Sequence, residues 1–115
     1  MDSFLIFFYI LDQCYVPDQE DDLGGFLGAI SPELWDDGKP MDRAVLNDWE
    51  KKCEKETINN QNIIEKIIEF LESYEKQFGF NFFNTKERLI TLNENAIVEN
   101  AIVKAKTMLK IFSYD

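Results

Sequence analysis

Three carboxylates at alternate positions early in the chain have the chemistry of a calcium-binding loop. Asp18, Glu20 and Asp22 would supply hard oxygen ligands at the spacing with which such a loop begins. The glycine required at the sharp turn of the loop is replaced by Leu23, and the position of its bidentate glutamate falls on Ala29. Because both positions are wrong, the sequence predicts no calcium or magnesium site here.

Other kinds of catalytic or ligand-binding chemistry lack the residues that they need. The chain contains no His, which removes the commonest general base and rules out Ser-His and Cys-His nucleophiles within one chain. A second acidic cluster, Asp36-Asp37-Gly38-Lys39, includes a lysine and offers too few oxygens for a metal. The glycine-rich residues 24–28 lack the lysine and hydroxyl of a phosphate-binding loop. We therefore predict a protein that is not an enzyme and that uses no metal and no cofactor.

The acidic residues are concentrated in the first third of the chain. Residues 1–38 contain nine acids and no Lys or Arg, whereas residues 39–115 contain thirteen acids and twelve bases, for a formal net charge of −10. A local negative potential of this kind attracts a basic partner and speeds its association, and it repels nucleic acid. The alternative interpretation is an acidic surface that only keeps the protein in solution.

The length and the composition of the chain are those of a single domain spanning residues 1–115. Apolar residues make up 45% of the chain and aromatic residues 14%, which is enough for a core. The apolar run Phe4–Leu11 is far shorter than the ~20 residues of a membrane helix, and acids rather than bases flank it, unlike a secretion signal. Cys14 and Cys53 form no CxxC motif, so we expect reduced thiols, a cytoplasmic location and no membrane partner.

Apolar residues recur at helical spacing along most of the chain, which predicts an all-α fold. The run Phe4–Leu11 is apolar nearly all round and is expected in a helix at the centre of the bundle. Pro17 and Gly79 would each end a helix, and Thr91 would begin the last one in a capping box with Glu94. The sequence thus predicts an irregular bundle of four to five helices, at about residues 2–15, 18–27, 42–54, 60–78 and 91–112, with a further turn at 31–35 and an aromatic connector at 80–84.

Three stretches in the first half of the chain form a pattern. They are Asp21-Asp22-Leu23-Gly24-Gly25-Phe26-Leu27-Gly28, Leu34-Trp35-Asp36-Asp37-Gly38-Lys39-Pro40-Met41-Asp42-Arg43-Ala44 and Asp48-Trp49. The pattern resembles a group of small bacterial proteins with DDLG-x-LL, DG-x-P-x-D-x-A and D-W, whose helices end in a Phe-Leu-x-x-Tyr-like sequence, as in Phe70-Leu71-Glu72-Ser73-Tyr74. The resemblance covers about residues 4–80, and some members of the group look like immunity proteins of polymorphic or contact-dependent toxin systems.

The resemblance implies an immunity protein whose partner is a basic toxin domain. It carries over no catalytic or ligand residue, and each residue of the pattern also has a capping or turn role open to it. Trp49 is expected in the core, whereas Trp35 is either a core residue or a binding anchor. The candidate partner-binding residues lie in the acidic, turn-rich segment 18–40: Asp18, Glu20, Asp21, Asp22, Trp35, Asp36 and Asp37. Reversing the charge of Asp21, Asp22, Asp36 and Asp37 together is expected to weaken binding without unfolding the domain.

A second interpretation is a non-enzymatic structural or adaptor module that binds another helix through apolar grooves, with self-association left open. Salt separates the two interpretations, because ionic strength screens an acidic binding surface but barely affects apolar burial.

Overall fold

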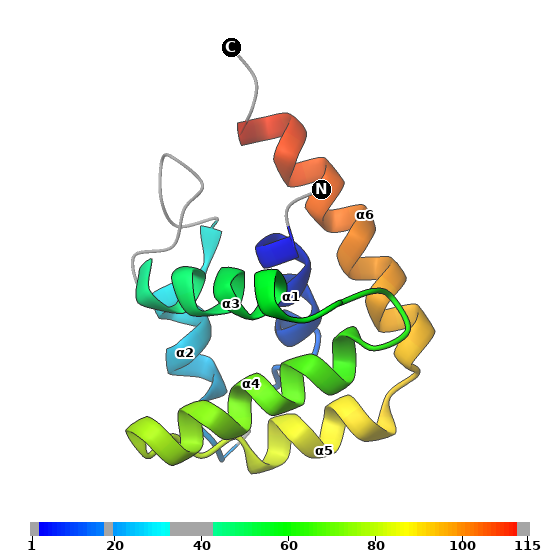
Figure 1. Ribbon diagram of the computed structural model, residues 1–115. Helices are drawn as coiled ribbons and strands as arrows, with labels where there is room; N and C mark the ends of the chain where they lie inside the picture. The colour runs from blue at the N-terminus through cyan, green and yellow to red at the C-terminus, as the bar shows by residue number, and fades with distance from the viewer. Residues whose placement is uncertain (1–2, 18–19, 33–42, 113–115) are drawn as a thin grey trace.

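The computed structural model describes residues 3–17, 20–32 and 43–112, and most of these residues are helical (Figure 1). The helices of the described ranges are α1 (Ser3–Asp12), α2 (Leu23–Ile30), α3 (Arg43–Lys55), α4 (Ile63–Phe78), α5 (Phe83–Thr91) and α6 (Glu94–Phe112). The predicted all-α class is confirmed. The predicted number of helices is too low, because six helices occur in the described part of the chain.

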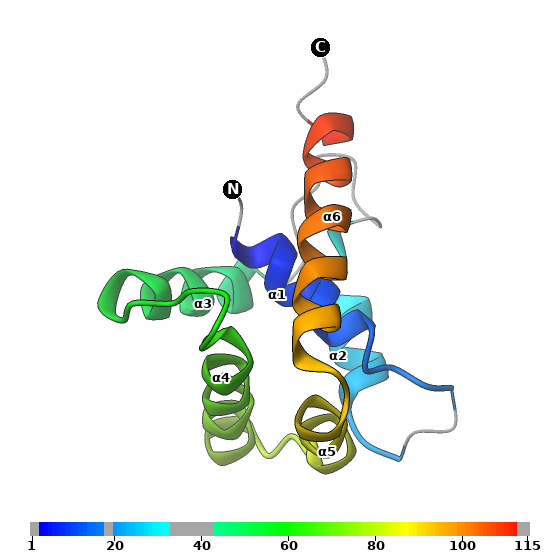
Figure 2. The same cartoon turned by 90° about the vertical axis from the view of Figure 1, so that its right-hand side faces the viewer.

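Helix α1 lies at the centre of the molecule, as its uniformly apolar sequence predicts. Every residue from Phe4 to Leu11 is buried, and α1 contacts α2, α3 and α6. Figures 1 and 2 show α6 running past α1 on one side, with α3 and α4 crossing on another. A helix that is apolar on all sides is stable only when neighbours cover all of those sides, which explains why the other helices surround α1 at different angles.

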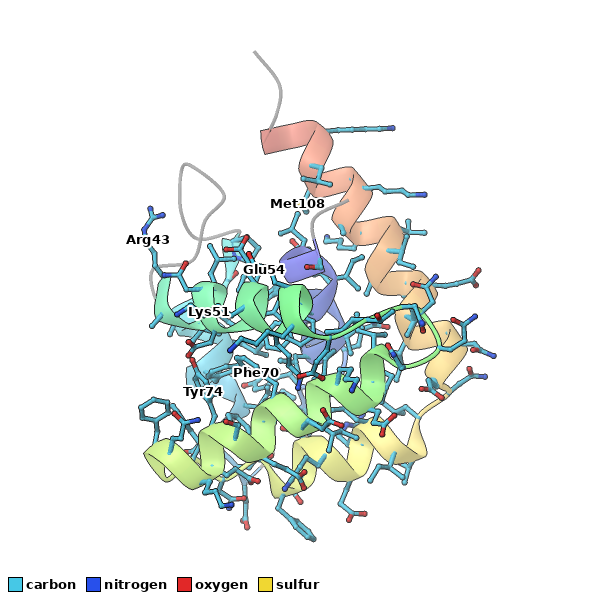
Figure 3. All side chains as sticks on the ribbon, viewed as in Figure 1. Arg43, Lys51, Glu54, Phe70, Tyr74 and Met108 are labelled. Carbon is cyan, nitrogen blue, oxygen red and sulfur yellow. The ribbon has the colours of Figure 1, made fainter. Side chains whose placement is uncertain are left out.

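Aromatic rings join α1, α3 and α4 at the centre of the core. The indole of Trp49 on α3 lies 4.5 Å from the ring of Phe7 on α1 and 5.7 Å from the ring of Phe70 on α4, measured between centroids. The ring of Phe70 also stacks on Tyr74 at 4.7 Å, and both residues lie between α3 and α4 (Figure 3). The core position predicted for Trp49 is confirmed, because its side chain is completely buried.

Helix α4 ends where the sequence predicts. Gly79 has a φ of +78°, and its backbone N–H donates to the carbonyl of Glu75, which closes the last turn. Glycine adopts this left-handed conformation without the steric cost that a Cβ would add. The helix begins at Ile63 rather than near residue 60, because the Asn59 side chain accepts hydrogen bonds from the backbone N–H groups of Gln61 and Asn62 in the preceding turn.

The sequence does not reveal helix α5, and it misplaces the start of α6. Helix α5 buries only Thr85 and Leu89, a spacing of four residues with one polar member, so it has no apolar stripe from which to predict it. Thr91 is the last residue of α5 and not the cap of α6. The cap of α6 is Asn93, whose side-chain oxygen accepts the backbone N–H of Ala96 at 3.0 Å.

The first two helices also differ from their predicted bounds. Helix α1 ends at Asp12, before residue 15, and α2 covers Leu23–Ile30 instead of residues 18–27. Ser31 and Pro32 follow α2, while the rest of the predicted turn at 31–35 and the predicted cap at Asp42 lie outside the described residues.

Candidate functional site

The predicted partner-binding residues divide into two groups. Asp18, Trp35, Asp36 and Asp37 lie outside the described residues. Glu20, Asp21 and Asp22 lie directly before α2, in one short segment. Glu20 is exposed, whereas Asp21 and Asp22 make hydrogen bonds to residues far along the chain.

The carboxylate of Asp21 joins the start of α2 to α5. Its Oδ2 accepts hydrogen bonds from both the backbone N–H and the hydroxyl of Thr85, each at 2.8 Å, and its Oδ1 accepts the N–H of Leu23 at 3.0 Å. Thr85 is completely buried, so these bonds satisfy donors that water cannot reach. Asp21 therefore has a structural role in the fold, which its turn-like sequence context does not reveal.

Asp22 makes a second connection from the same turn. Its Oδ2 accepts the backbone N–H of Asn81 at 2.7 Å, and its own N–H donates to the carbonyl of Asn81 at 2.8 Å. The pair of bonds fixes the start of α2 against the connector between α4 and α5. Charge reversal at Asp21 and Asp22 would disrupt both connections, so we no longer expect the combined reversal of acids to leave the fold unaffected.

Other described residues of the family-like pattern also have structural partners. The Tyr74 hydroxyl donates to Oδ2 of Asp48 at 2.7 Å, and Trp49 packs on Phe7 and Phe70 as described above. The D-W and Phe-Leu-x-x-Tyr parts of the pattern thus meet where α3 crosses α4. Core packing explains the presence of Trp49 and Phe70, and one hydrogen bond explains the presence of Asp48 and Tyr74.

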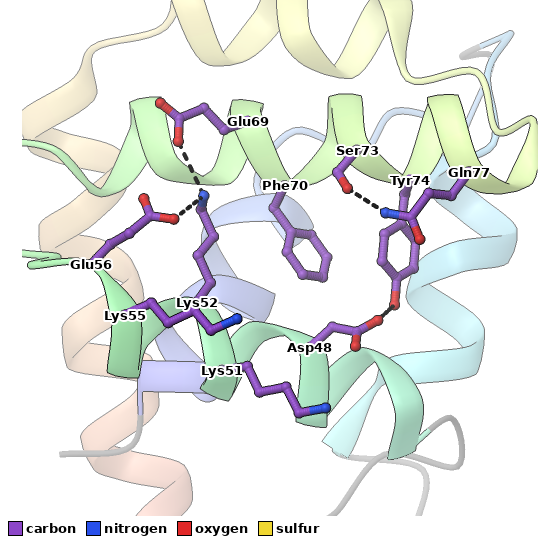
Figure 4. Close-up of a pocket in the computed structure, with 10 residues that line it drawn as sticks. All are labelled: Asp48, Lys51, Lys52, Lys55, Glu56, Glu69, Phe70, Ser73, Tyr74 and Gln77. Atoms are coloured by element: carbon purple, nitrogen blue, oxygen red, sulfur yellow. Dashed lines mark hydrogen bonds and ion pairs between the residues drawn. The ribbon is translucent and has the colours of Figure 1, made fainter.

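A polar pocket of about 280 Å³ lies between α3 and α4 (Figure 4). Its lining includes acids, bases and two of the aromatic residues of α4: Asp48, Lys51, Lys52, Lys55, Glu56, Glu69, Phe70, Ser73, Tyr74 and Gln77. The Gln77 amide donates to the Ser73 hydroxyl at 2.7 Å across one turn of α4. Lys51 and Lys55 lie along the α3 side of the pocket (Figure 4).

Ion pairs at one end of this pocket hold α3 to α4. Lys52 lies 2.9 Å from Glu56 and 3.1 Å from Glu69, and Lys66 lies 2.9 Å from the other oxygen of Glu56. Partial burial opposes the charge of Lys52, but its hydrogen bonds to the two glutamates outweigh burial and raise its pKa. The pKa of Glu56 is lowered by the hydrogen bonds from Lys66 and Lys52. The pocket thus offers a fixed set of charges that bridges two helices. Of this network the sequence shows only the i,i+4 spacing of Lys52 and Glu56 and the i,i+3 spacing of Lys66 and Glu69.

A third polar connection joins α4 to α5. Glu75 accepts the Lys86 ammonium at 2.6 Å and the backbone N–H of Phe82 at 2.7 Å. Burial opposes ionisation of Glu75, but these hydrogen bonds together outweigh it, and the pKa of the carboxyl is lowered from its usual 4.5. The stabilisation is therefore present above pH 4.5 and is lost as the pH falls through the lowered pKa.

The Glu75→Gln variant tests this connection. We expect it to lower the free energy of unfolding by about 1 kcal/mol at pH 7. The difference from wild type should shrink as the pH falls below 4.5, because the wild-type carboxyl becomes protonated first in the unfolded state and then, at lower pH, in the folded state. Urea denaturation at pH 7 and pH 3 measures both values, with the exposed Glu87→Gln as the matched control. A difference that stays constant with pH would contradict the assignment.

Two shallow grooves flank α1. The groove between α1 and α2 has a volume of about 320 Å³ and is lined by Phe8, Asp12, Tyr15, Gly24, Leu27, Gly28 and Ser31. The groove between α1 and α6 has a volume of about 340 Å³ and is lined by Tyr9, Asp12, Gln13, Asn100 and Lys104. Asp12 lines both grooves, and its position in the sequence gives no sign of this.

The two cysteines are free. Burial raises the pKa of the Cys14 thiol to about 11, so at neutral pH it stays protonated and unreactive. Cys53 is half-buried, with its sulfur 3.5 Å from the hydroxyl of Ser3.

None of the described helices has the length and apolar character needed to cross a membrane. Within the described ranges, no three Asp, Glu or Cys side chains gather closely enough to hold a metal ion. Neither a protein-family model, nor a curated protein, nor a solved structure matches the chain.

Proposed function

We propose that this chain is a binding protein that neutralises a basic partner through an acidic surface, as an immunity protein neutralises its toxin. One observation carries the proposal: residues 1–38 contain nine acids and no Lys or Arg. The resemblance of residues 4–80 to small bacterial proteins, some of them immunity-like, agrees with it. The toxin partner, the cytoplasmic location and the absence of catalysis are parts of the same proposal.

The described contacts support a negative charge that is available to a partner. Lys86 also lies 3.6 Å from Glu72. The ion pairs of Lys52, Lys66 and Lys86 take their acids from Glu56, Glu69, Glu72 and Glu75, and neither Glu20 nor Asp22 takes part in them. The hydrogen bond that the Asp22 carboxylate accepts comes from the backbone N–H of Asn81, a neutral donor, which holds this carboxylate in place without cancelling its charge. A fixed negative surface of this kind speeds association with a basic protein.

Capture from a lysate of the source organism tests the proposal. We expect the immobilised chain to retain a basic, toxin-like protein at low salt and to release it at high salt, with mass spectrometry as the readout. A variant that carries Lys at Glu20, Asp36 and Asp37 should retain at least about tenfold less of that protein. Circular dichroism checks that the variant is folded.

The matched control reverses three exposed acids elsewhere, Glu65, Glu87 and Glu99. It has the same net charge as the first variant. If both variants retained equally little of the basic protein, the total charge and not the acidic segment would determine binding. Retention of the chain itself, or of an acidic protein at every salt concentration, would contradict the proposal.

An adaptor that binds through apolar contacts is the second candidate function, because three large apolar side chains are exposed near one another in the sequence. Phe78 at the end of α4 is 61% exposed, and Phe83 and Ile90 on α5 are 62% and 68% exposed. Capture that is insensitive to salt but lost in the Phe83→Ser, Ile90→Ser double variant would favour this function.

A further inference from the structure

The proposed function does not use the polar pocket between α3 and α4. Its volume of about 280 Å³ lies near the lower end of the range of small-molecule sites. All of its lining residues come from residues 48–77, outside the acidic first third of the chain. Lys51, Lys55 and Ser73 are exposed at its edge, so a molecule can enter it from solvent. The pocket therefore has the size and access of a site for a small molecule.

The acids of the pocket differ in whether a cation balances them. In the ion-pair network at one end, two lysines, Lys52 and Lys66, contact two glutamates, Glu56 and Glu69, so the network is neutral. At the other end, Asp48 accepts a hydrogen bond from a tyrosine hydroxyl, a neutral donor, and keeps its charge. One negative charge thus remains among the acids of the pocket.

Lys51 and Lys55 contribute two positive charges that no acid balances. They lie one turn apart on α3, on the α3 side of the pocket (Figure 4). Among the described residues, neither ammonium group lies within ion-pair distance of an acid. Like charges at this spacing repel each other, and an anion between them would remove that repulsion. Two positive charges against the one of Asp48 leave an excess of one positive charge.

The net charge of −10 does not exclude an anion from this pocket. At physiological ionic strength, exposed charges farther away than about 8 Å are largely screened. The charge of the pocket therefore depends on its own lysines and acids more than on the distant acidic segment.

The α4 side of the pocket offers an apolar surface and a hydroxyl. Phe70 and Tyr74 both line it, and their rings stack with centroids 4.7 Å apart. The Ser73 hydroxyl accepts the Gln77 amide at 2.7 Å, and within the described contacts its own O–H stays available to donate. A ligand with a ring and an anionic oxygen would use both features.

We propose that the α3–α4 pocket binds a small aromatic acid with one carboxylate. The carboxylate accepts hydrogen bonds from the Lys51 and Lys55 ammonium groups and from the Ser73 hydroxyl, and the ring of the acid lies against Phe70 and Tyr74. A carboxylate neutralises the excess positive charge, whereas a phosphate ester, with a charge of about −1.5 to −2, exceeds it beside Asp48. This site is separate from the acidic segment and does not depend on the proposed function.

Benzoate is the probe for this site, and benzamide is the matched neutral ligand of the same shape. We expect benzoate to shift the backbone amide signals of residues 48–56 and 69–77 in the labelled protein, with a dissociation constant of about 1 mM or lower. Benzamide should bind at least about tenfold more weakly, because it lacks the charge. Phenyl phosphate should also bind more weakly than benzoate.

Two double variants test the lysines. Lys51→Gln, Lys55→Gln should bind benzoate at least about tenfold more weakly than wild type. The control, Lys106→Gln, Lys110→Gln, removes two exposed lysines of α6 that have the same spacing and also take part in no ion pair of the described residues, and it should bind as wild type does. Because all four lysines are exposed, the melting temperature of each variant should stay within about 3 °C of wild type, measured by circular dichroism.

Equal losses of affinity in the two double variants would attribute binding to the net charge and overturn the site. Shift changes confined to other residues would do the same, as would benzamide or phenyl phosphate that binds as tightly as benzoate, or the absence of any shift at about 10 mM benzoate. The experiment needs only the purified chain and a small molecule. Its outcome is therefore decided separately from the lysate capture that tests the proposed function.

Discussion

Replacing Trp49 with alanine should lower the free energy of unfolding by about 3–5 kcal/mol, the largest effect that we expect of a single substitution. The indole is completely buried and lies against Phe7 and Phe70, so it connects α1, α3 and α4. Its removal loses both the burial of a large apolar surface and the ring contacts, and leaves a cavity. Because small domains are stable by only about 5–15 kcal/mol, this loss would remove a large fraction of the free energy of unfolding. Urea denaturation measures the change.

Phe83→Ala is the control for this substitution. Phe83 is 62% exposed, so its removal should change stability by no more than about 0.5 kcal/mol. Trp49→Phe should lower the free energy of unfolding by an amount between those of Trp49→Ala and Phe83→Ala, since it retains a ring in the same place. If Trp49→Ala were no more destabilising than Phe83→Ala, the packing described for the centre of the core would be wrong.

Replacing Asp21 with alanine should lower the free energy of unfolding by about 2–4 kcal/mol, because buried donors lose the carboxylate that accepts their hydrogen bonds. The N–H and hydroxyl of Thr85 would both lose their partner, in a place that water does not reach. The start of α2 would also lose the bond to the N–H of Leu23. A double-mutant cycle with Thr85→Val isolates the part that belongs to the hydroxyl.

Glu20→Ala provides the comparison for Asp21. Glu20 lies next in sequence and is exposed, so its removal should leave stability nearly unchanged. The two variants therefore separate carboxylates that maintain the fold from those available to a partner. Equal and small changes in the free energy of unfolding at both positions would show that the contact between α2 and α5 contributes little to stability.

The helices with dense apolar stripes could be predicted from the sequence, and those held by specific polar contacts could not. Phe4–Leu11 in α1 and the Ile63-to-Tyr74 stripe of α4 indicate burial by their spacing alone. Helix α5 buries Thr85 and Leu89, and its place depends on hydrogen bonds that it donates to Asp21, 64 residues earlier in the chain, and on the bond from Phe82 to Glu75 of α4. No local pattern encodes such a contact.

The candidate site was predicted only as a region. The uneven charge is a property of the sequence, but whether an acid faces solvent or a buried donor depends on the tertiary fold. Asp21 and Glu20 have similar sequence contexts and different environments in the structure. The α1–α2 groove arises from the way two helices cross, so Asp12 and Gly28 could not be identified from their spacing.

The pairing of α1 with α6 has a consequence for the order in which the protein can fold. The Gln13 amide donates to the carbonyl of Ile97 at 2.9 Å, across 84 residues of chain, and α6 covers a side of α1 with Ile97, Ala101, Ala105 and Met108. On the ribosome α1 emerges well before α6, the helix that covers it. The apolar side of α1 therefore stays exposed until synthesis has passed Met108, and during that interval the nascent chain depends on chaperones or on transient local contacts to avoid aggregation.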